Sequence, residues 1–291
     1  MKLVVNKFDL LNLGKIAAIE IFCVLKDIKP ISRLNVGETN LTKLSNILKK
    51  LNLCTEKSDY RFIPSIDDKG NFNVGVTQKT KQKKGDYFIY ISKNKELIKK
   101  IKQLENNLKS GNDHKEIAKL LGYPKCCTDF YVNYRAEAVN KRKDDYTLIS
   151  LKKSKSYVFD YQLNNVLRYF DIGLITFFPC SYQCKEALKM SKKIFEEIKK
   201  NSSEYANYLT KRLKCAIIYT DNDGIHVLKD FNFEKGIINY GKVESTCENK
   251  LNKQLSSSNK IKIVNKNFIK IMNNETLIKV LKKNAGILIF K

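Results

Sequence analysis

The sequence predicts an α+β protein with a mixed N-terminal block, a central helical domain that carries cysteines, and a small α/β C-terminal block. Three observations predict this class. Hydrophobic residues make up 43% of the 291 residues, which is enough for a packed core. Only 4 prolines and 12 glycines interrupt the chain, so long elements are expected. The hydrophobic period changes along the chain between the helical value and the alternation typical of strands.

The first block, residues 1–110, is predicted to combine helices with strands. The expected helices are residues 8–28, which end before Pro30, residues 42–53 with Asn40 or Thr42 as cap, and residues 93–109. The expected strands are residues 60–66, 72–77 and 87–92, the first two joined by a glycine turn at residues 67–70. Cys23 and Cys54 lie in apolar helical patterns and are expected in the core.

The second block, residues 111–212, is predicted to be mainly helical. The expected helices are residues 114–121 with Asn112 or Asp113 as cap and Gly122 behind them, residues 125–139, residues 157–169 and residues 180–200. A short apolar strand is expected at residues 174–178. The Lys- and Asp-rich residues 140–155 are expected to be exposed.

The third block, residues 213–291, is predicted to form a small α/β unit. Short strands are expected at residues 216–219, 225–228, 261–264 and 287–290. The polar residues 248–260 read as a linker, and a helix is expected near residues 276–283.

Two short strings place cysteines directly behind a proline at a predicted helix start: YPKCC at residues 123–127 and FPCSYQC at residues 178–184. The free N–H groups and partial positive charge of a helix N-terminus favour thiolate over thiol. If the two ends meet, Cys126, Cys127, Cys180 and Cys184 form a thiolate cluster of the kind that binds zinc or an iron–sulfur cluster.

The spacing of these cysteines leaves several interpretations open. On a helix, Cys180 and Cys184 share one face, whereas adjacent Cys126 and Cys127 point about 100° apart, so three ligands are easier to bring to one ion than four. Adjacent cysteines are unusual for a structural zinc site, which favours iron–sulfur slightly. The alternatives are buried structural cysteines and a redox or nucleophilic thiol.

Acid–base chemistry has few candidates in this chain. There are only 2 histidines, and neither His114 nor His226 is expected to ligate a metal. Asp129 and Glu186 follow the cysteines within about one helical turn, which makes them the candidate catalytic acids. The alternative is that each is a first-turn acid that complements the helix dipole.

The formal net charge of +25 indicates either polyanionic partners such as RNA, DNA, a nucleotide or an acidic partner, or a lysine-rich surface without a specific partner, because the excess is spread along the chain. Lys79, Lys81, Lys83 and Lys84 form either a phosphate-contacting finger or a solvated loop. Residues 116–123 also look like the first half of a DNA-binding helix-turn-helix. The second half fits badly, because thiols, an acid and aromatic residues stand where base-reading side chains are usual.

No export signal is visible, and the apolar residues 16–25 are too short to span a membrane and are interrupted by Glu20. We therefore expect a buried helix there, no membrane association, a cytoplasmic location and reduced cysteines.

The string LGYPKCCTDFY at residues 121–131, together with FPCSYQCKEAL at residues 178–188, resembles an archaeal family catalogued as domain of unknown function 483. The similarity, which the LGYPxCC and PCSxxC strings carry, covers roughly residues 110–200 of this chain. The resemblance implies a cytoplasmic archaeal protein in which both strings belong to one site, and it implies no reaction.

The sequence thus predicts a cytoplasmic metalloprotein with a Cys-ligated iron–sulfur or zinc site that acts on an anionic substrate such as a nucleotide or RNA. The alternative is a basic nucleic-acid-binding protein with structural cysteines.

Overall fold

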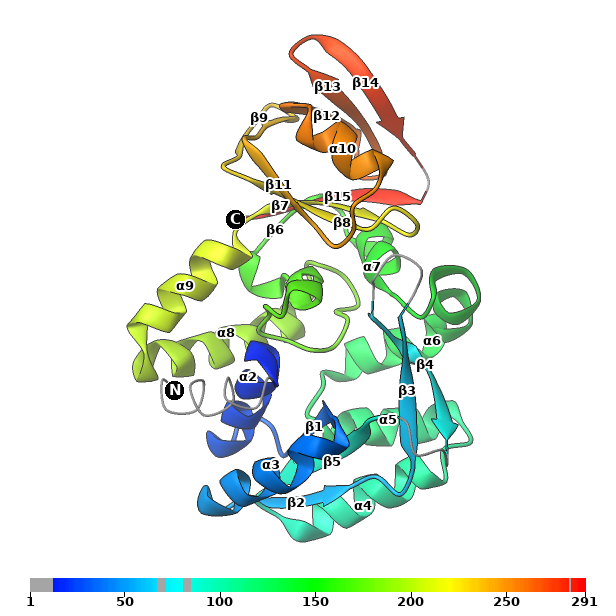
Figure 1. The fold of residues 1–291 in the computed structure, drawn as a ribbon, viewed down its shortest axis with the longest axis vertical. Helices are drawn as coiled ribbons and strands as arrows, with labels where there is room; N and C mark the ends of the chain where they lie inside the picture. The colour runs from blue at the N-terminus through cyan, green and yellow to red at the C-terminus, as the bar shows by residue number, and fades with distance from the viewer. Residues whose placement is uncertain (1–12, 67–71, 81–84, 283) are drawn as a thin grey trace.

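The computed structural model describes residues 13–66, 72–80, 85–282 and 284–291 of the chain. Within these residues the protein is α+β, as predicted (Figure 1). Figure 1 shows the elements of the N-terminal and middle thirds side by side in the lower part of the molecule and the C-terminal strands at the top. None of the helices in this part of the chain has the length and apolar character that a membrane crossing requires.

The N-terminal third is built around a three-stranded antiparallel sheet. Its central strand is β5 (Tyr87–Ser92), which pairs with β1 (Ile31–Val36) on one side and β2 (Cys54–Lys57) on the other. The remaining elements are the helices α2 (Gly14–Leu25), α3 (Glu38–Lys50) and α4 (Lys95–Asn106), and the separate hairpin β3 (Arg61–Ile66) and β4 (Phe72–Thr80). Helix α2 is buried from Ala17 to Val24, which confirms the expected buried helix.

The middle third is mainly helical. Its elements are α5 (Gly111–Leu120), α6 (Lys125–Arg142), α7 (Thr147–Lys153), the short 3-10 helices η1 (Tyr161–Leu163) and η2 (Val166–Phe170), α8 (Lys185–Asn201) and α9 (Ser203–Leu213). A large hydrophobic core joins α2, η2 and the inner faces of α8 and α9, and includes Ile19, Leu167, Ile194 and Leu209.

The C-terminal third contains two five-stranded sheets. The lower sheet has the order β11 (Lys242–Ser245), β8 (Ile225–Lys229), β7 (Ala216–Thr220), β15 (Ala285–Phe290) and β6 (Val158–Phe159). The upper sheet has the order β14 (Thr276–Leu281), β13 (Phe268–Asn273), β12 (Lys260–Asn265), β10 (Ile237–Asn239) and β9 (Asn232–Glu234). The short helix α10 (Lys250–Ser256) adds Leu251 and Leu255 to the core that lies between them.

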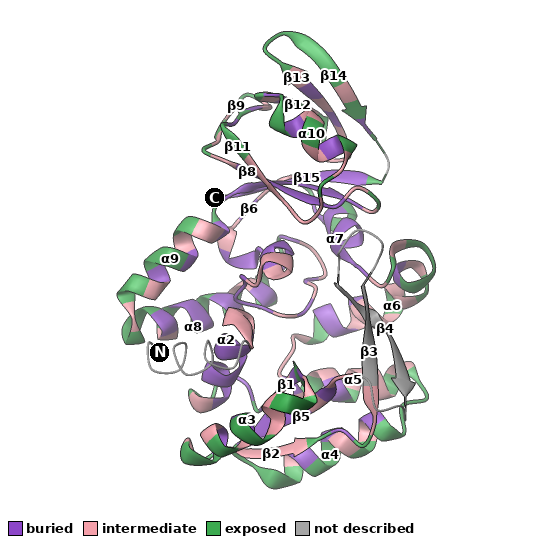
Figure 2. Ribbon diagram, viewed as in Figure 1, coloured by how far each residue is buried: buried purple, intermediate pink, exposed green. Residues whose placement is uncertain are grey.

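The lower sheet is buried on both faces. Ile218, Ile287 and Ile289 belong to the core shared with the upper sheet, whereas Ile217, Leu288 and Phe290 belong to the core shared with the helices. In Figure 2 its strands β7, β8 and β15 are accordingly coloured as buried. This sheet therefore joins the C-terminal third to the rest of the molecule.

Several predicted helix starts and one strand region differ from the structure. Helix α3 begins at Glu38, because the extended Gly37 precedes it, so Asn40 and Thr42 lie inside the helix. Helix α5 is capped by Ser110, whose hydroxyl pairs with the backbone of Asp113 in a capping box. Strands β1 and β2 were not predicted, and the half-buried Cys54 lies on β2 rather than on a helix.

Two expectations for the middle third are wrong. Residues 140–155 are not an exposed stretch, since α7 is buried from Thr147 to Leu151. Residues 157–169 form β6 and the two 3-10 helices instead of one helix, because the backbone of Phe159 and Tyr161 bonds to Lys291.

Three further elements also differ. Residues 174–178 contain no strand. Residues 248–260 hold α10, capped by the Asn249 side chain. Residues 276–281 form β14, because pairing with β13 decides the conformation of a segment that local pattern leaves open. The turn predicted at residues 67–70 lies outside the described residues.

Candidate metal centre

The two cysteine strings meet in space. The Sγ atom of Cys184 lies 3.6 Å from that of Cys126 and 3.6 Å from that of Cys127, and the latter two are 3.9 Å apart. With Cys180 included, all four sulfur atoms lie within 4.8 Å of one another. Cys127 and Cys184 are buried, Cys180 is half-buried and Cys126 is exposed, so the cluster sits at the edge of the core.

The α5–α6 turn supplies Cys126 and Cys127. Gly122 ends α5 with a φ of +74°, and a Cβ there would stand 3.1 Å from Pro30 of the N-terminal third. Pro124 then caps α6, and its carbonyl accepts the N–H groups of Cys127 and Thr128. Both cysteines therefore stand in the first turn of α6, as predicted, where the helix dipole favours a thiolate.

Cys180 is not on a helix, which corrects the expected helix from residue 180. Helix α8 begins at Lys185, and Cys184 is its N-cap, with Sγ 3.5 Å from the N–H of Ala187. Cys180 lies in the turn before it, and its N–H points at the Cys127 sulfur, 3.4 Å away. Cys180 and Cys184 therefore reach the cluster from a turn and a helix N-cap, and not from one face of a helix.

Side chains of the middle third hold the segment from Phe177 to Gln183 in place, and we call this segment the cysteine loop. Asn165 donates to the Phe177 carbonyl at 3.1 Å, and Ser150 donates to the Pro179 carbonyl at 2.7 Å. The N–H of Tyr182 donates to Ser154 Oγ at 2.8 Å. These three hydrogen bonds fix the loop without using a cysteine side chain.

Asn165 is held in turn by its neighbours. Its Oδ1 accepts from the Tyr182 hydroxyl at 3.2 Å, so one buried amide bonds to both ends of the cysteine loop. The guanidinium of Arg168 lies 4.4 Å from the Phe178 ring and donates to Asp145 at 2.6 Å. These contacts explain why Asp145 is buried in a stretch whose composition predicted exposure.

The thiol hydrogen bonds decide where negative charge forms first. Contacts from Cys127 and Cys180, together with the Ala187 N–H, hold the pKa of Cys184 far below its usual range. The same contacts favour the thiol form of Cys127 and raise its pKa. A metal cation bound by these sulfur atoms would displace the protons that the thiols carry.

The predicted acid–base residues lie near the cluster but outside it. Asp129 forms ion pairs with Lys115 at 3.0 Å and Lys125 at 3.1 Å, and these hydrogen bonds lower the pKa of Asp129. Glu186 is exposed on the first turn of α8. Their catalytic role stays a prediction.

Neither of the two histidines belongs to the four-cysteine group found among the described residues. His114 packs its ring against Tyr131 at a centroid distance of 5.8 Å. His226 is fully buried on β8, with Nε2 2.9 Å from the Asp223 carbonyl oxygen and Nδ1 2.9 Å from Ser245 Oγ.

The predicted lysine finger is largely outside the described residues. Lys79 lies on β4, where its backbone is opposite Phe62 of β3. Lys81, Lys83 and Lys84 lie outside the described part of the chain. Its contact with nucleic acid stays a prediction.

Sequence reasoning missed a buried ion pair that ties the N-terminal third to the first cysteine string and to Thr176, two residues before the second string. The carboxylate of Glu20 accepts from Lys29 and from Thr176, the latter at 2.9 Å. The Lys29 ammonium lies 5.0 Å from the ring centroid of Tyr123, which opens the first string. A lone acid inside an apolar helix was the available signal, since such residues are buried only when paired.

The family comparison agrees with the two strings. Residues 86–214 match the model of a family described as "Protein of unknown function (DUF483)", a longer stretch than the roughly 110–200 expected. No curated protein and no solved structure matches the chain. The matched stretch contains all four clustered cysteines and the residues that hold the cysteine loop, so the segment that builds the candidate metal centre belongs to the DUF483 family.

Proposed function

We propose that this protein is a metalloprotein in which Cys126, Cys127, Cys180 and Cys184 bind a single zinc ion. The observation that carries the proposal is the spacing of the sulfur atoms. A tetrahedral ion with metal–sulfur bonds of about 2.3 Å needs sulfur atoms about 3.8 Å apart. The three shortest separations are 3.6, 3.6 and 3.9 Å, so small movements would complete the tetrahedron.

A single ion fits this spacing better than an iron–sulfur cluster. In a four-iron cluster each thiolate binds a different iron, and the body of the cluster keeps the thiolates apart. Zinc is favoured over ferrous iron because a given thiolate site binds zinc more tightly in the usual order of divalent affinities. An iron–sulfur cluster, which the adjacent cysteines favoured, is the alternative.

Four thiolates fill the coordination of zinc and leave no position for water, which is typical of a structural site. The ion would then link the start of α6 to the cysteine loop. The proposal includes a cytoplasmic location, because a reducing compartment keeps such thiols available for metal.

Metal analysis after anaerobic purification tests the proposal. We expect about one zinc per chain and no visible absorption, since zinc has a filled d shell. Replacement by cobalt should produce the strong visible bands of a tetrahedral thiolate site. Iron together with inorganic sulfide would establish the cluster instead, and a protein without metal would overturn both.

Single cysteine variants locate the ion. Cys126→Ser should lower metal content strongly while the fold is retained, because this side chain is exposed. The matched control is Cys23→Ala, which removes a fully buried thiol outside the four-cysteine cluster and should keep the metal. Equal metal content in both variants would contradict the assignment.

A further inference from the structure

The upper C-terminal sheet has one buried face and one open face. Ile238, Ile261 and Ile271 point into the core beneath it. The alternate residues point outward, and Figure 2 shows exposed residues along the β13–β14 hairpin. Leu277 is 52% exposed and Val280 is 36% exposed, which is unusual for two large apolar side chains on one edge strand.

Lysines face one another across this open surface. Lys262 of β12 is directly opposite Lys270 of β13, and the next residue across is Val280 of β14. Like charges in directly opposed positions destabilise a sheet. The pair therefore costs stability in the free protein, and an anion that binds over both ammonium groups would remove this repulsion.

The neighbouring rows combine cations with apolar side chains. Met272 lies opposite Lys260 on one side and Leu277 on the other. At the far end of the sheet the Lys282 ammonium lies 4.5 Å from the ring centroid of Phe268. Glu275 is the only acidic residue in the described strands and turn from Lys260 to Lys282, and it forms an ion pair with Lys260.

We propose that this open sheet face, defined by Lys262, Lys270, Met272, Leu277 and Val280, binds single-stranded nucleic acid. Lysines would contact the phosphates, and the apolar side chains between them would contact the unstacked bases. A basic open surface can follow the phosphates of a single strand, whose unpaired bases are free for apolar contact, whereas a duplex hides the faces of its bases. The proposal does not depend on the metal centre.

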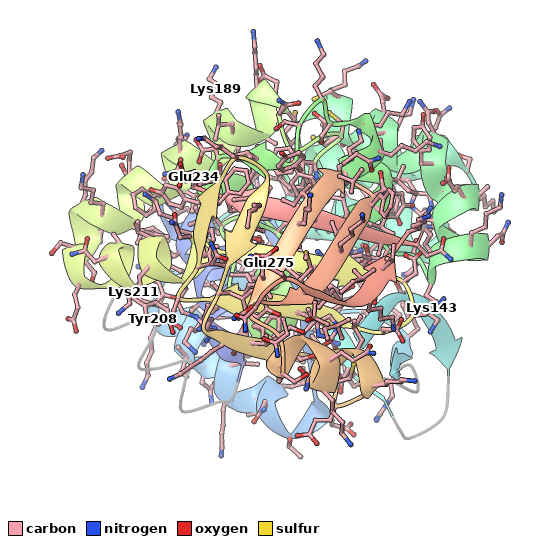
Figure 3. The ribbon with its side chains drawn as sticks, turned by 90° about the horizontal axis from the view of Figure 1, so that it is seen from above. Lys143, Lys189, Tyr208, Lys211, Glu234 and Glu275 are labelled. Carbon is pink, nitrogen blue, oxygen red and sulfur yellow. The ribbon has the colours of Figure 1, made fainter. Side chains whose placement is uncertain are left out.

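Fluorescence anisotropy with a labelled RNA of about 12 nucleotides tests this face, using the full chain. The variant is Lys262→Gln with Lys270→Gln. Figure 3 looks down on the upper sheet and labels Lys189 and Lys211, which lie on the helices α8 and α9 of the middle third. Lys189→Gln with Lys211→Gln is the matched control, because it removes the same charge from exposed positions.

Two lost phosphate contacts should reduce the slope of log affinity against log salt by about 1.4 for a single strand. The sheet variant should therefore bind about 25-fold more weakly at about 0.1 M salt, with a much smaller loss at 1 M. The helix control should bind like the wild type. The sheet variant should also be at least as stable as the wild type, since it removes a repulsive pair.

Three results would overturn the proposal. The first is equal weakening in both double variants, which would indicate a diffuse charge effect. The second is loss of binding only when Lys79, Lys81, Lys83 and Lys84 are replaced, which would place the contact on the predicted lysine finger. The third is a wild type that binds anionic lipid vesicles or nothing, but not RNA.

Discussion

Cys184 explains how two adjacent cysteines reach one site. Cys126 and Cys127 are adjacent in the first turn of α6, one exposed and one buried, yet their sulfur atoms lie only 3.9 Å apart. The sulfur of Cys184, at the N-cap of α8, lies 3.6 Å from both. The expected difficulty of joining both residues to one ion does not arise, because the two side chains converge on Cys184 instead of pointing apart.

At the same scale, His226 predicts a pH dependence of stability. Burial lowers the pKa of His226 to about 4, from an ordinary value of 6.5. The unfolded chain therefore takes up a proton more readily than the folded one as the pH falls below 6.5. The contribution of neutral His226 to the free energy of unfolding is complete above pH 6.5. At pH 5 the free energy of unfolding is lower by about 2 kcal/mol for this reason.

Chemical denaturation at pH 7 and pH 5 measures this effect. In His226→Gln the titrating group is gone, so the free energy of unfolding should fall less between these pH values than in the wild type. The difference between the free energies of unfolding of the wild type and the variant should decrease by about 2 kcal/mol between pH 7 and pH 5. An unchanged gap would show that His226 does not carry the dependence.

At the scale of elements, the cysteine loop predicts a role for Asn165 in metal affinity. This side chain bonds to the Phe177 carbonyl and to the Tyr182 hydroxyl, and it touches no cysteine of the cluster in the contacts described. Residues that orient metal ligands typically contribute 10–100-fold in affinity. We expect Asn165→Ala to weaken zinc binding by about that factor.

Asn164→Ala is the control for this measurement. Asn164 is equally buried, but it donates to the Leu213 carbonyl at the end of α9 rather than to the cysteine loop. Both variants leave a carbonyl without its donor and should lose about 1–3 kcal/mol of stability. Competition with a chelator should show weaker zinc binding only for Asn165→Ala. Equal zinc affinities of the two variants would contradict the role of Asn165 in positioning the cysteine loop.

Elements with a complete local signal could be predicted from the sequence. The apolar residues 87–92 form the expected strand, and a helix lies within the amphipathic residues 93–109, as expected. Residues 140–155 could not be predicted, because Asp145 is buried by partners on η2 that no local window contains. The hydrophobic pattern of residues 276–281 fits a helix or a strand, and pairing with β13 decides that they form a strand.

The candidate site also has features that the sequence predicted and features that it did not. The four cysteines and their helix starts were visible as residue types behind prolines. Their meeting was a hypothesis, since more than 50 residues separate the two strings. Asn165 could not be assigned to the site, because a single asparagine carries no information about a partner elsewhere in the chain. Glu20 signals that it is paired, but not which residues are its partners.

At the scale of the whole molecule, the doubly buried lower sheet predicts how the C-terminal third behaves alone. A fragment of residues 213–291 would lack β6, the parallel neighbour of β15. It would also expose Ile217, Leu288 and Phe290, which pack against the helices. We expect this fragment to aggregate or to bind a hydrophobic dye strongly.

Expression of the fragment beside the full chain provides the measurement. A soluble fragment with a cooperative thermal transition and weak dye binding would contradict the expectation. It would also support the domain boundary predicted at residues 212 and 213, which otherwise stays a prediction.

Strand β5 has a related consequence for the DUF483 segment. The matched stretch begins at residue 86, so it carries β5 but neither β1 nor β2, the two strands that flank it. Transplanted into another chain, the segment would arrive with both hydrogen-bonding edges of β5 bare. The stretch that the family model recognises is therefore not a complete folding unit. A host chain would have to supply two strands to pair with the edges of β5.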